Sequence, residues 1–325
     1  MFILTSISTD PYFNLAMEEY LLKETGGEYF LTYINEPSVI VGKHQNAYAE
    51  INLDFVRRNR IKVARRLTGG GTVFHDPGNL NFAFIVSGRE GHLVDFKKHT
   101  RPVIGFLDSL SVNAEFAGNN DLLMNGLKIS GNAEHVFRNR VLHHGTLLFN
   151  SQLAELSEAL KVNPMKYRDK AVRSVRSRVS NIAGSLEKEM TIEQLRNLLT
   201  AFIRKETGGE DYHLTDEEME RIKALRDEKF STWEWNFGYA PKYTFYKTFS
   251  RDRKEVSITL EVVKGVIEKA SVEGALFGGK CKQDLSRLLA GKQHRYDSLL
   301  QELRDPLIDG CFEEITQQEL VQELF

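Results

Sequence analysis

The chain has 325 residues, of which 41% are hydrophobic and 27% charged, and its formal net charge is -2. This length suffices for one large and one small domain with a full core, so we expect two domains. A net charge so close to zero excludes a protein that gathers nucleic acid through a strong positive field.

The N-terminus and the cysteines predict where the protein works. The first residues, MFILTSISTDPYF, contain no basic leader, and no apolar run approaches the roughly 18 residues that a membrane-spanning helix requires. The two cysteines, Cys281 and Cys311, match neither a disulfide framework nor a metal-ligand spacing. We therefore expect a cytoplasmic protein, in a reducing compartment and without a membrane anchor.

The first third of the chain predicts helices and short strands. Asp10 can cap a helix whose first position is Pro11, and apolar residues recur on one face of it as far as Gly26. A second helix is predicted at 52–59. Apolar runs predict strands at 29–34, 38–42, 62–67, 71–76 and 81–86.

The middle of the chain predicts two hairpins and then helices. Asn125 and Gly126 can both take positive φ, so a tight turn should place Lys128 on a strand just after it. A second hairpin should turn near Asn139. Helices are expected at 151–160, at 191–207, and from 215 onward, where Thr215 and Glu218 form a capping box.

The pattern of predicted secondary structure changes near Lys242, where we place a domain boundary. Residues 254–263 and 266–274 predict a hairpin with a Lys264-Gly265 turn, and amphipathic stretches follow. Local hairpins mixed with scattered helices favour an α+β fold over a doubly wound parallel sheet. We expect a large domain at 1–242, with a mixed β-sheet flanked by helices, and a small α+β domain at 243–325.

The stretch RRLTGGGTVFHDPGN, residues 65–79, carries three consecutive glycines. A dinucleotide-binding turn would need GxGxxG opening a helix, and a phosphate loop of the NTPase kind would need Gly-Lys-Ser/Thr; neither is present. A simple tight turn would not require the flanking Arg65 and Arg66. A backbone nest, in which amide N–H groups converge on an anion, uses every residue of the stretch. The adjoining His75-Asp76 pair could be a metal or acid-base pair, although a lone His-Asp at a strand end is more often structural, and Asp76 with Asn79 can shape the following turn.

Two further stretches carry polar and charged residues. Lys128 is followed by Ser130, Gly131 and Asn132, so its strand is expected to face a polar cleft, where Asp121 is a candidate metal ligand. The segment 166–178 is strongly basic and contains one tyrosine as its only aromatic residue, which weakens a nucleic-acid interpretation. Together with the glycine nest it predicts a loop that closes over phosphates.

These motifs resemble those of the lipoate-protein ligases, in the same order and over nearly the whole length. The family carries RRxSGGGxVxHDxGN, GxKxSGxA and HHGxLL, and this chain carries RRLTGGGTVFHDPGN, GLKISGNA and HHGTLLF. Thr68 replaces the usual serine and keeps the hydroxyl. SVRSRVSN at 174–181 and WEWNFGYAP at 233–241 are similar to later landmarks of the family.

The resemblance implies a two-step reaction, with ATP and Mg²⁺ as cofactors. Lipoate and ATP give lipoyl-AMP and pyrophosphate, and the acyl group then passes to a lysine of a lipoyl domain. The implied acceptors are E2 subunits of 2-oxoacid dehydrogenases and the glycine cleavage H protein. Val73, Phe74, Phe82 and Phe84 are candidates for an apolar slot that holds the acyl chain.

The resemblance also implies a role for individual residues. The ATP site would consist of Arg66, Gly71, Thr72, Val73, Phe74 and Lys128. The lipoate site would consist of Lys128, Gly70 and His75, and the loop over the adenylate of Arg176, Arg178 and Ser180. Lys128, between the two reacting anions, is the expected catalytic residue.

The sequence is compatible with alternative functions. A cofactor-free octanoyl or lipoyl transferase would need a nucleophilic thiol in the large domain, and no cysteine precedes Cys281. A biotin ligase lacks support because its arginine-glycine loop is not matched. A nonenzymatic nucleic-acid-binding protein is favoured only by the basic loop. The sequence does not decide between lipoate and octanoate as the substrate.

Overall fold

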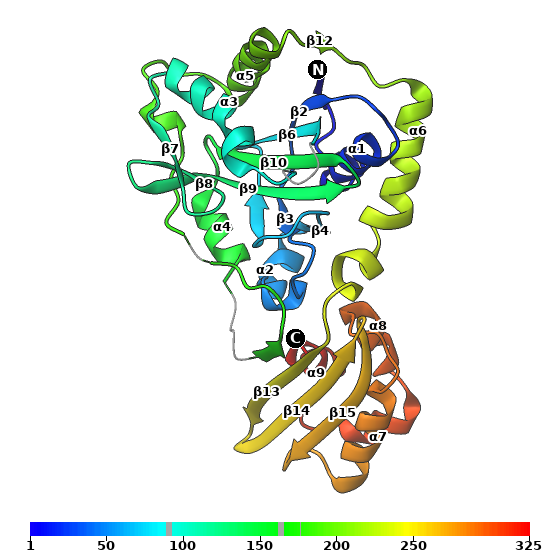
Figure 1. The fold of residues 1–325 in the computed structure, drawn as a ribbon. Helices are drawn as coiled ribbons and strands as arrows, with labels where there is room; N and C mark the ends of the chain where they lie inside the picture. Colours follow the sequence, from blue (N-terminus) through cyan, green and yellow to red (C-terminus); the bar gives the residue numbers. More distant parts are fainter. Residues whose placement is uncertain (89–92, 162–165, 176) are drawn as a thin grey trace. The chain divides into compact units, whose positions relative to one another are not determined.

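The computed structural model describes residues 1–88, 93–161, 166–175 and 177–325, which form two compact units (Figure 1). Unit 1 comprises Met1–Lys43, Phe55–Leu160 and Ser174–Thr232, and unit 2 comprises His44–Asp54, Lys161–Arg173 and Trp233–Phe325. The described part of the chain has no helix long and apolar enough to cross a bilayer. The predicted α+β class is confirmed: strands and helices are mixed in both units.

Unit 1 is built on a mixed eight-stranded sheet of order β12-β1-β2-β6-β10-β9-β8-β7. Strands β12, β1 and β2 run parallel, and the remaining neighbours are antiparallel. Their bounds are β1 Phe2–Thr5, β2 Tyr29–Ile34, β6 Asn79–Ser87, β7 Ala114–Ala117, β8 Asp121–Met124, β9 Leu127–Phe137, β10 Arg140–Leu148 and β12 Glu210–Asp211.

A second, three-stranded sheet of order β4-β3-β5 carries the glycine stretch between two of its strands. Its strands are β3 Ser38–Val41, β4 Lys62–Arg65 and β5 Val73–His75. The helices of unit 1 are α1 Pro11–Lys23, α3 Phe96–Ser109, α4 Leu153–Ala159, α5 Ile192–Thr207 and α6 Asp216–Leu225, and α2 Leu53–Arg58 spans the division between the units.

The two faces of the large sheet differ in character. Phe82 and Phe84 of β6 are buried in a core that also contains Phe106 of α3 and Leu199 of α5. Residue 83, between them, points to the opposite face, because side chains alternate along a strand. On that opposite face His144 of β10, which pairs with Ala83, is bonded to α1 and to the glycine stretch. The site therefore belongs to the face that α1 covers.

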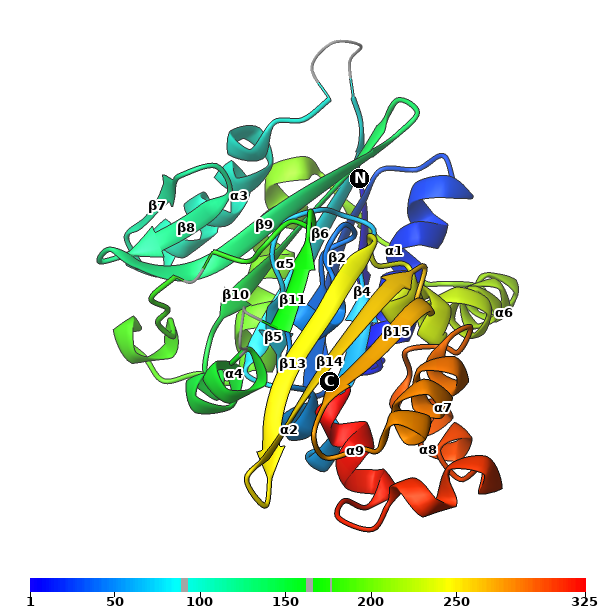
Figure 2. The ribbon, with the colours of Figure 1, turned by 90° about the horizontal axis from the view of Figure 1, so that it is seen from below.

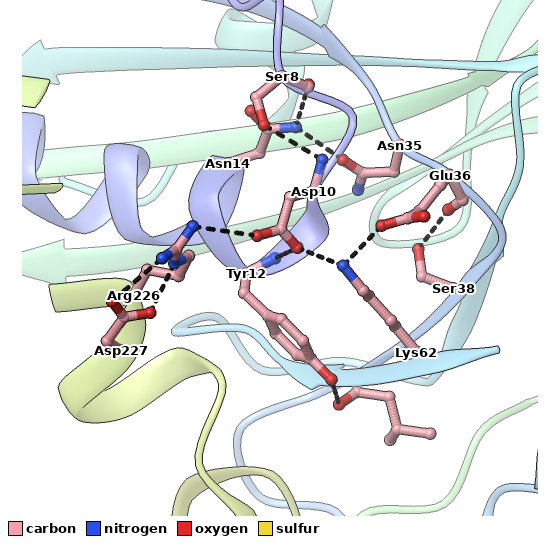
Figure 3. Close-up of polar contacts among 11 residues, drawn as sticks. Ser8, Asp10, Tyr12, Asn14, Asn35, Glu36, Ser38, Lys62, Arg226 and Asp227 are labelled. Carbon is pink, nitrogen blue, oxygen red and sulfur yellow. Dashed lines mark hydrogen bonds and ion pairs between the residues drawn. The ribbon is translucent and has the colours of Figure 1, made fainter. Parts of the chain in front are cut away.

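An ionic cluster fixes the loop before α1 against β4 (Figure 3). Asp10 caps α1 by accepting from the backbone N–H of Tyr12, and its carboxylate lies 2.9 Å from Nζ of Lys62. Lys62 also pairs with Glu36 at 2.6 Å, and Arg226 approaches Asp10 at 3.9 Å. These contacts connect the start of α1 with the turn between β2 and β3 and with the end of α6.

Unit 2 is a four-stranded antiparallel sheet of order β11-β13-β14-β15 with helices packed on it. Figure 2 shows β13, β14 and β15 side by side, with the orange and red helices on one side of them. The elements are β11 Tyr167–Asp169, β13 Tyr243–Arg251, β14 Lys254–Val263, β15 Val266–Gly274, α7 Gly279–Leu289, α8 Tyr296–Glu302 and α9 Gln317–Glu323.

Two features of unit 2 differ from the sequence analysis. Tyr48 and Tyr167 lie in its hydrophobic core although both precede Lys242, because β11 pairs with β13 and the hydroxyl of Tyr48 donates to the carbonyl of His294. The prediction that Cys281 and Cys311 form no disulfide is wrong: the two are bonded, with their Cα atoms 5.6 Å apart. The sequence separation of 30 residues hid a pairing that the packing of the helical segments creates.

Candidate functional site

The glycine stretch is wrapped around the guanidinium group of Arg66. Arg66 donates from Nη2 to the carbonyls of Gly69 (2.6 Å) and Gly71 (2.7 Å), and from Nη1 to the carbonyl of Ile40 (3.0 Å). Arg66 is 5% exposed. Burial lowers its pKa to about 10, so that it stays charged at neutral pH. Arg66 therefore fixes the conformation of the loop through hydrogen bonds to the loop carbonyls.

The direction of these carbonyls determines where the loop amides point. In a trans peptide the C=O of one residue and the N–H of the next point in opposite directions, so the N–H groups of Gly70 and Thr72 point away from Arg66. Thr72 donates to the hydroxyl of Ser174 at 2.8 Å. Within the described residues, the N–H groups of Gly69, Gly70 and Gly71 have no hydrogen-bond partner. Gly70 has φ +84°, a conformation that favours glycine. This arrangement fits the predicted anion nest.

A chain of buried polar groups supports the loop. Thr68 accepts from Nε of Arg66 (2.8 Å) and lies 2.8 Å from Nε2 of His144. Nδ1 of His144 lies 2.9 Å from Oε2 of Glu18. The other carboxylate oxygen, Oε1, accepts from the hydroxyl of Tyr33 at 2.9 Å. Glu18 is the acidic partner that favours the charged form of Arg66 against burial. Sequence reasoning missed Glu18 and Tyr33, because nothing local in the helix or strand sets them apart.

Lys128 meets the basic segment that follows residue 173. Its backbone N–H donates to the carbonyl of Arg178 (2.9 Å), and its own carbonyl accepts from the N–H of Ser180 (3.0 Å). Nζ of Lys128 pairs with Asp121 at 2.8 Å, and both side chains are about one-quarter exposed, at 22% and 25%. The structure thus brings Lys128, Asp121, Arg178 and Ser180 together. Arg176, which the resemblance also assigns to this loop, lies outside the described residues.

The same segment connects the lysine with the glycine loop. Ser174 accepts from Thr72 at one end of it, and Arg178 and Ser180 pair with Lys128 at the other. The described residues of this segment, 174–175 and 177–180, which we call the basic strap, thus bond to two stretches that lie more than 50 residues apart in the sequence. The predicted ATP-site and loop residues are neighbours for this reason.

Small residues line the sheet between Lys128 and His144. Thr146 of β10 accepts from the N–H of Gly131 (3.2 Å), and the side chain of Lys128 lies over Gly131, where an added Cβ would be 3.1 Å from Nζ. Two residues further along both strands, His144 pairs with Ala133. Phe82 and Phe84, predicted as acyl-slot candidates, lie in the core on the opposite face, as strand alternation requires. Val73 is half-buried on β5 and Phe74 is buried.

The first histidine of the HHG motif belongs to a separate cluster on that opposite face. Oε1 of Glu134 accepts from Nδ1 of His99 (2.9 Å) and Nδ1 of His143 (2.8 Å), and Oε2 accepts from the N–H of Asp95. Among the described residues, these three form the one group of at least three His, Cys, Asp or Glu side chains whose ligand atoms all lie within 4.8 Å of one another. These hydrogen bonds attach α3 to the sheet, so we interpret the cluster as structural.

The glycine of the HHG motif has a packing role. A Cβ at Gly145 would lie 2.2 Å from Oδ1 of Asn132 and 2.4 Å from the ring of Phe82. No side chain fits there, so the motif requires glycine at this position for close packing between β6, β9 and β10.

The fold and this site define a class of protein by comparison. Residues 10–204 match the Lipoyl protein ligase A/B catalytic domain, and residues 240–324 match the Bacterial lipoate protein ligase C-terminus. The chain belongs to the lipoate-protein ligase family. It is 43% identical over 323 residues to lipoate-protein ligase 1 of Staphylococcus aureus, covering 99% of this chain and 98% of that protein.

Solved structures give the same assignment. A lipoate-protein ligase A bound with ATP superimposes with a TM-score of 0.63 at 27% identity, covering 73% of this chain and 98% of that one. The bipartite lipoate protein ligase of Thermoplasma acidophilum, studied with its E2 lipoyl domain, gives a TM-score of 0.62 at 27% identity, covering 73% of this chain and 96% of its own.

Proposed function

We propose that this protein activates lipoate with ATP and transfers the lipoyl group to the ε-amino group of a lysine on a lipoyl domain. The observation that carries the proposal is the row of unpartnered loop amides at 69–71, within the described residues, which the basic strap connects to Lys128. Convergent N–H groups bind phosphate, and Lys128 lies at the other end of the strap. Relatives whose names specify lipoate and ATP support the substrates.

In the first step, a carboxylate oxygen of lipoate attacks the α-phosphorus of ATP. The new acyl-phosphate bond forms as the bond to the bridging oxygen breaks, and pyrophosphate leaves with the electron pair. Both reactants are anions, so a cation between them reduces their repulsion and stabilises the transition state. We assign this role to Lys128, whose ammonium group is a compact charge on a rigid strand.

The other residues of the predicted site receive supporting roles. Gly70 and Gly71 would present their amides to phosphate, and Arg66 would hold the loop in shape through its bonds to the loop carbonyls. Thr72, whose N–H donates to Ser174, would tie the loop to the basic strap. Val73 and Phe74 would continue the nucleotide site along β5. Arg178 and Ser180, and Arg176 by its position in the same segment, would cover the adenylate and exclude the water that would hydrolyse a mixed anhydride.

Magnesium would enter this site with the nucleotide. Mg²⁺ is usually held by one or two carboxylates together with phosphate oxygens and water. Asp121 offers one partly exposed carboxylate beside Lys128 and fits that requirement. When bound, the ion would neutralise charge on the phosphates.

In the second step, the acceptor amine attacks the acyl carbon, loses a proton, and AMP leaves. Direct transfer is favoured because unit 1, which carries Lys128, contains no cysteine and so has no thiol to carry a thioester. We propose E2 subunits and the glycine cleavage H protein as acceptors, in line with the E2 lipoyl domain of the archaeal relative. The cytoplasm, where ATP is abundant, is the proposed location.

The test is lipoate-dependent exchange of labelled pyrophosphate into ATP, followed by addition of a lipoyl domain. Exchange should require lipoate and Mg²⁺, and the lipoyl domain should gain one lipoyl group on a lysine. A protein that transfers acyl groups without ATP would instead be the acyltransferase of the same superfamily.

A further inference from the structure

A line of buried amides runs from the loop before α1 to His75. Asn14 of α1 donates from Nδ2 to the carbonyl of Ser8 (2.9 Å) and to Oδ1 of Asn35 (2.8 Å), and Figure 3 shows these three residues meeting. A main-chain carbonyl can only accept a hydrogen bond, which fixes the amide orientation of Asn14. The hydroxyl of Ser6 agrees with it by donating to Oδ1 of Asn14 at 2.7 Å.

The orientation passes from Asn14 to the imidazole ring. Because Oδ1 of Asn35 accepts from Asn14, its Nδ2 faces Nδ1 of His75, 3.0 Å away. An amide nitrogen only donates, so Nδ1 of His75 must accept. Burial, with Arg66 and His144 nearby, lowers the pKa of His75 to about 3. The ring is therefore neutral at pH 7, and its single proton is on Nε2.

This Nε2–H is a buried donor that no atom of the described residues uses. His75 is 5% exposed, and among the residues that the structure describes its Nε2 has no hydrogen-bond partner. Asn14 and Asn35, at 0% and 1% exposed, are buried as deeply as the ring they orient. A buried polar group without a partner is uncommon and unfavourable, so its persistence points to a ligand atom that completes it.

The place of His75 suggests which end of the substrate it meets. Its charged and titratable neighbours are Arg66 and His144, at the loop, whereas Lys128 lies over Gly131. Gly131 and Ala133 are two residues apart on β9, and His144 pairs with Ala133. An acyl chain held at Lys128 by its carboxyl end and laid along these small residues would point its far end toward His144, the electrostatic neighbour of His75. In lipoate that end carries the dithiolane sulfurs, and in octanoate it is a methyl group.

We propose that Asn14 and Asn35 are positioning residues that hold His75 as the Nε2–H tautomer, and that this N–H donates to a dithiolane sulfur and favours lipoate over octanoate. The inference rests on the proposed function for its substrate. Sulfur is a weak acceptor, so the preference is moderate. Octanoate would leave the buried donor unpaired, which is how a site rejects an analogue that lacks a hydrogen-bonding group.

The tautomer is tested by nitrogen NMR of ¹⁵N-histidine protein, with Asn35→Asp as the variant. The carboxylate of this variant would accept rather than donate, so the proton should move to Nδ1, whereas the wild-type ring should carry it on Nε2. A wild-type ring protonated on Nδ1 overturns the proposal. This spectrum needs no activity, so it is informative even if pyrophosphate exchange fails and the proposed function with it.

Selectivity is tested by pyrophosphate exchange with lipoate and with octanoate. His75→Phe and Asn35→Asp should lower the ratio of kcat/KM for lipoate to that for octanoate about 10-fold, because the loss with lipoate should exceed any loss with octanoate. The control His213→Phe alters an exposed histidine away from this line and should keep the wild-type ratio. An equal loss with both substrates would show a merely structural role and overturn the proposal.

If Asn35→Asp does not fold, Asn14→Asp provides the same test one step further away. Its carboxylate would remove the donor to Oδ1 of Asn35, so the Asn35 amide could turn and reverse the tautomer. Unchanged ¹⁵N shifts of His75 in a folded Asn14→Asp protein would show that the amide line does not set the ring, contrary to the proposal.

Discussion

The backbone N–H of Thr72 donates to the hydroxyl of Ser174, 2.8 Å away, and so ties the glycine loop to the start of the basic strap. At the other end the strap pairs with Lys128 through Arg178 and Ser180. The loop and the lysine therefore each hydrogen-bond to described residues of the same short segment. A change that moves the strap should affect both, which distinguishes this site from a loop and a lysine that act independently.

Lys128→Met should abolish activation while leaving the fold intact. Methionine keeps the length of the stem but removes the charge, so we expect lipoyl-AMP formation to fall about 100-fold or more. Asp121 would lose its partner at a partly exposed position, where such a loss costs little stability. Pyrophosphate exchange measures the chemistry, and thermal unfolding controls for the fold. Near-normal exchange would contradict the role of Lys128.

Gly71→Ala should weaken ATP binding by displacing the strap. A Cβ at Gly71 would lie 3.0 Å from Oγ and 3.2 Å from Cα of Ser174, so Ser174 must move. We expect a loss on the order of 10-fold in ATP affinity, measured by calorimetry. Gly69→Ala is the matched comparison, because its Cβ meets no described protein atom within 4 Å, and it should have the smaller effect. Equal effects of the two variants would mean that the strap is not involved.

Local turn chemistry made part of the fold predictable. Asn125 and Gly126 both have positive φ in the hairpin that precedes Lys128, and Thr215 and Glu218 form the predicted capping box. The long strand β13, in contrast, escaped prediction. Its turn to β14 uses Asp252 and Arg253, both with positive φ, and arginine gives no sequence signal for that conformation.

The candidate site could be predicted from the sequence only where its residues lie within one local motif. The glycine loop and Lys128 could be identified from their neighbours in sequence, but the partners that support them could not. Glu18 and His144 are 126 residues apart and meet only because α1 packs over β10. The assignment of residues 44–54 and 161–173 to unit 2 depends in the same way on long-range strand pairing and burial.

Glu134→Gln should change how the stability of the fold depends on pH. Hydrogen bonds from His143 and His99 hold the pKa of Glu134 at about 2, below its ordinary value of 4.5, in spite of burial. A depressed carboxyl pKa stabilises the fold above pH 4.5 and loses that contribution as the pH falls toward 2. Burial also lowers the pKa of His143, which opposes its protonation below pH 6.5. Urea unfolding of wild type should therefore weaken between pH 4.5 and 2.

The glutamine variant provides the comparison in that window. It lacks the carboxylate, so it should be less stable at neutral pH and should lose less stability than wild type between pH 4.5 and 2. If the stabilities of the two proteins fell in parallel as the pH is lowered, Glu134 would not be the cause of the loss in this range.

Replacing both cysteines, in a Cys281→Ser, Cys311→Ser variant, should spare the chemistry and weaken unit 2. The bond closes a loop with a sequence separation of 30 residues, and the chain-entropy account gives such a cross-link about 3.5 kcal/mol. We expect a lower unfolding temperature for unit 2, since both cysteines belong to its core cluster or pack against it. Transfer from lipoate and ATP should persist below that temperature, because in the proposed mechanism the acyl group passes directly to the acceptor amine. The rate of transfer from preformed lipoyl-AMP should rise with pH toward the pKa of the acceptor lysine. Mass spectrometry that trapped a lipoyl group on either cysteine of wild type during turnover, or a folded variant unable to transfer, would require a thioester route instead.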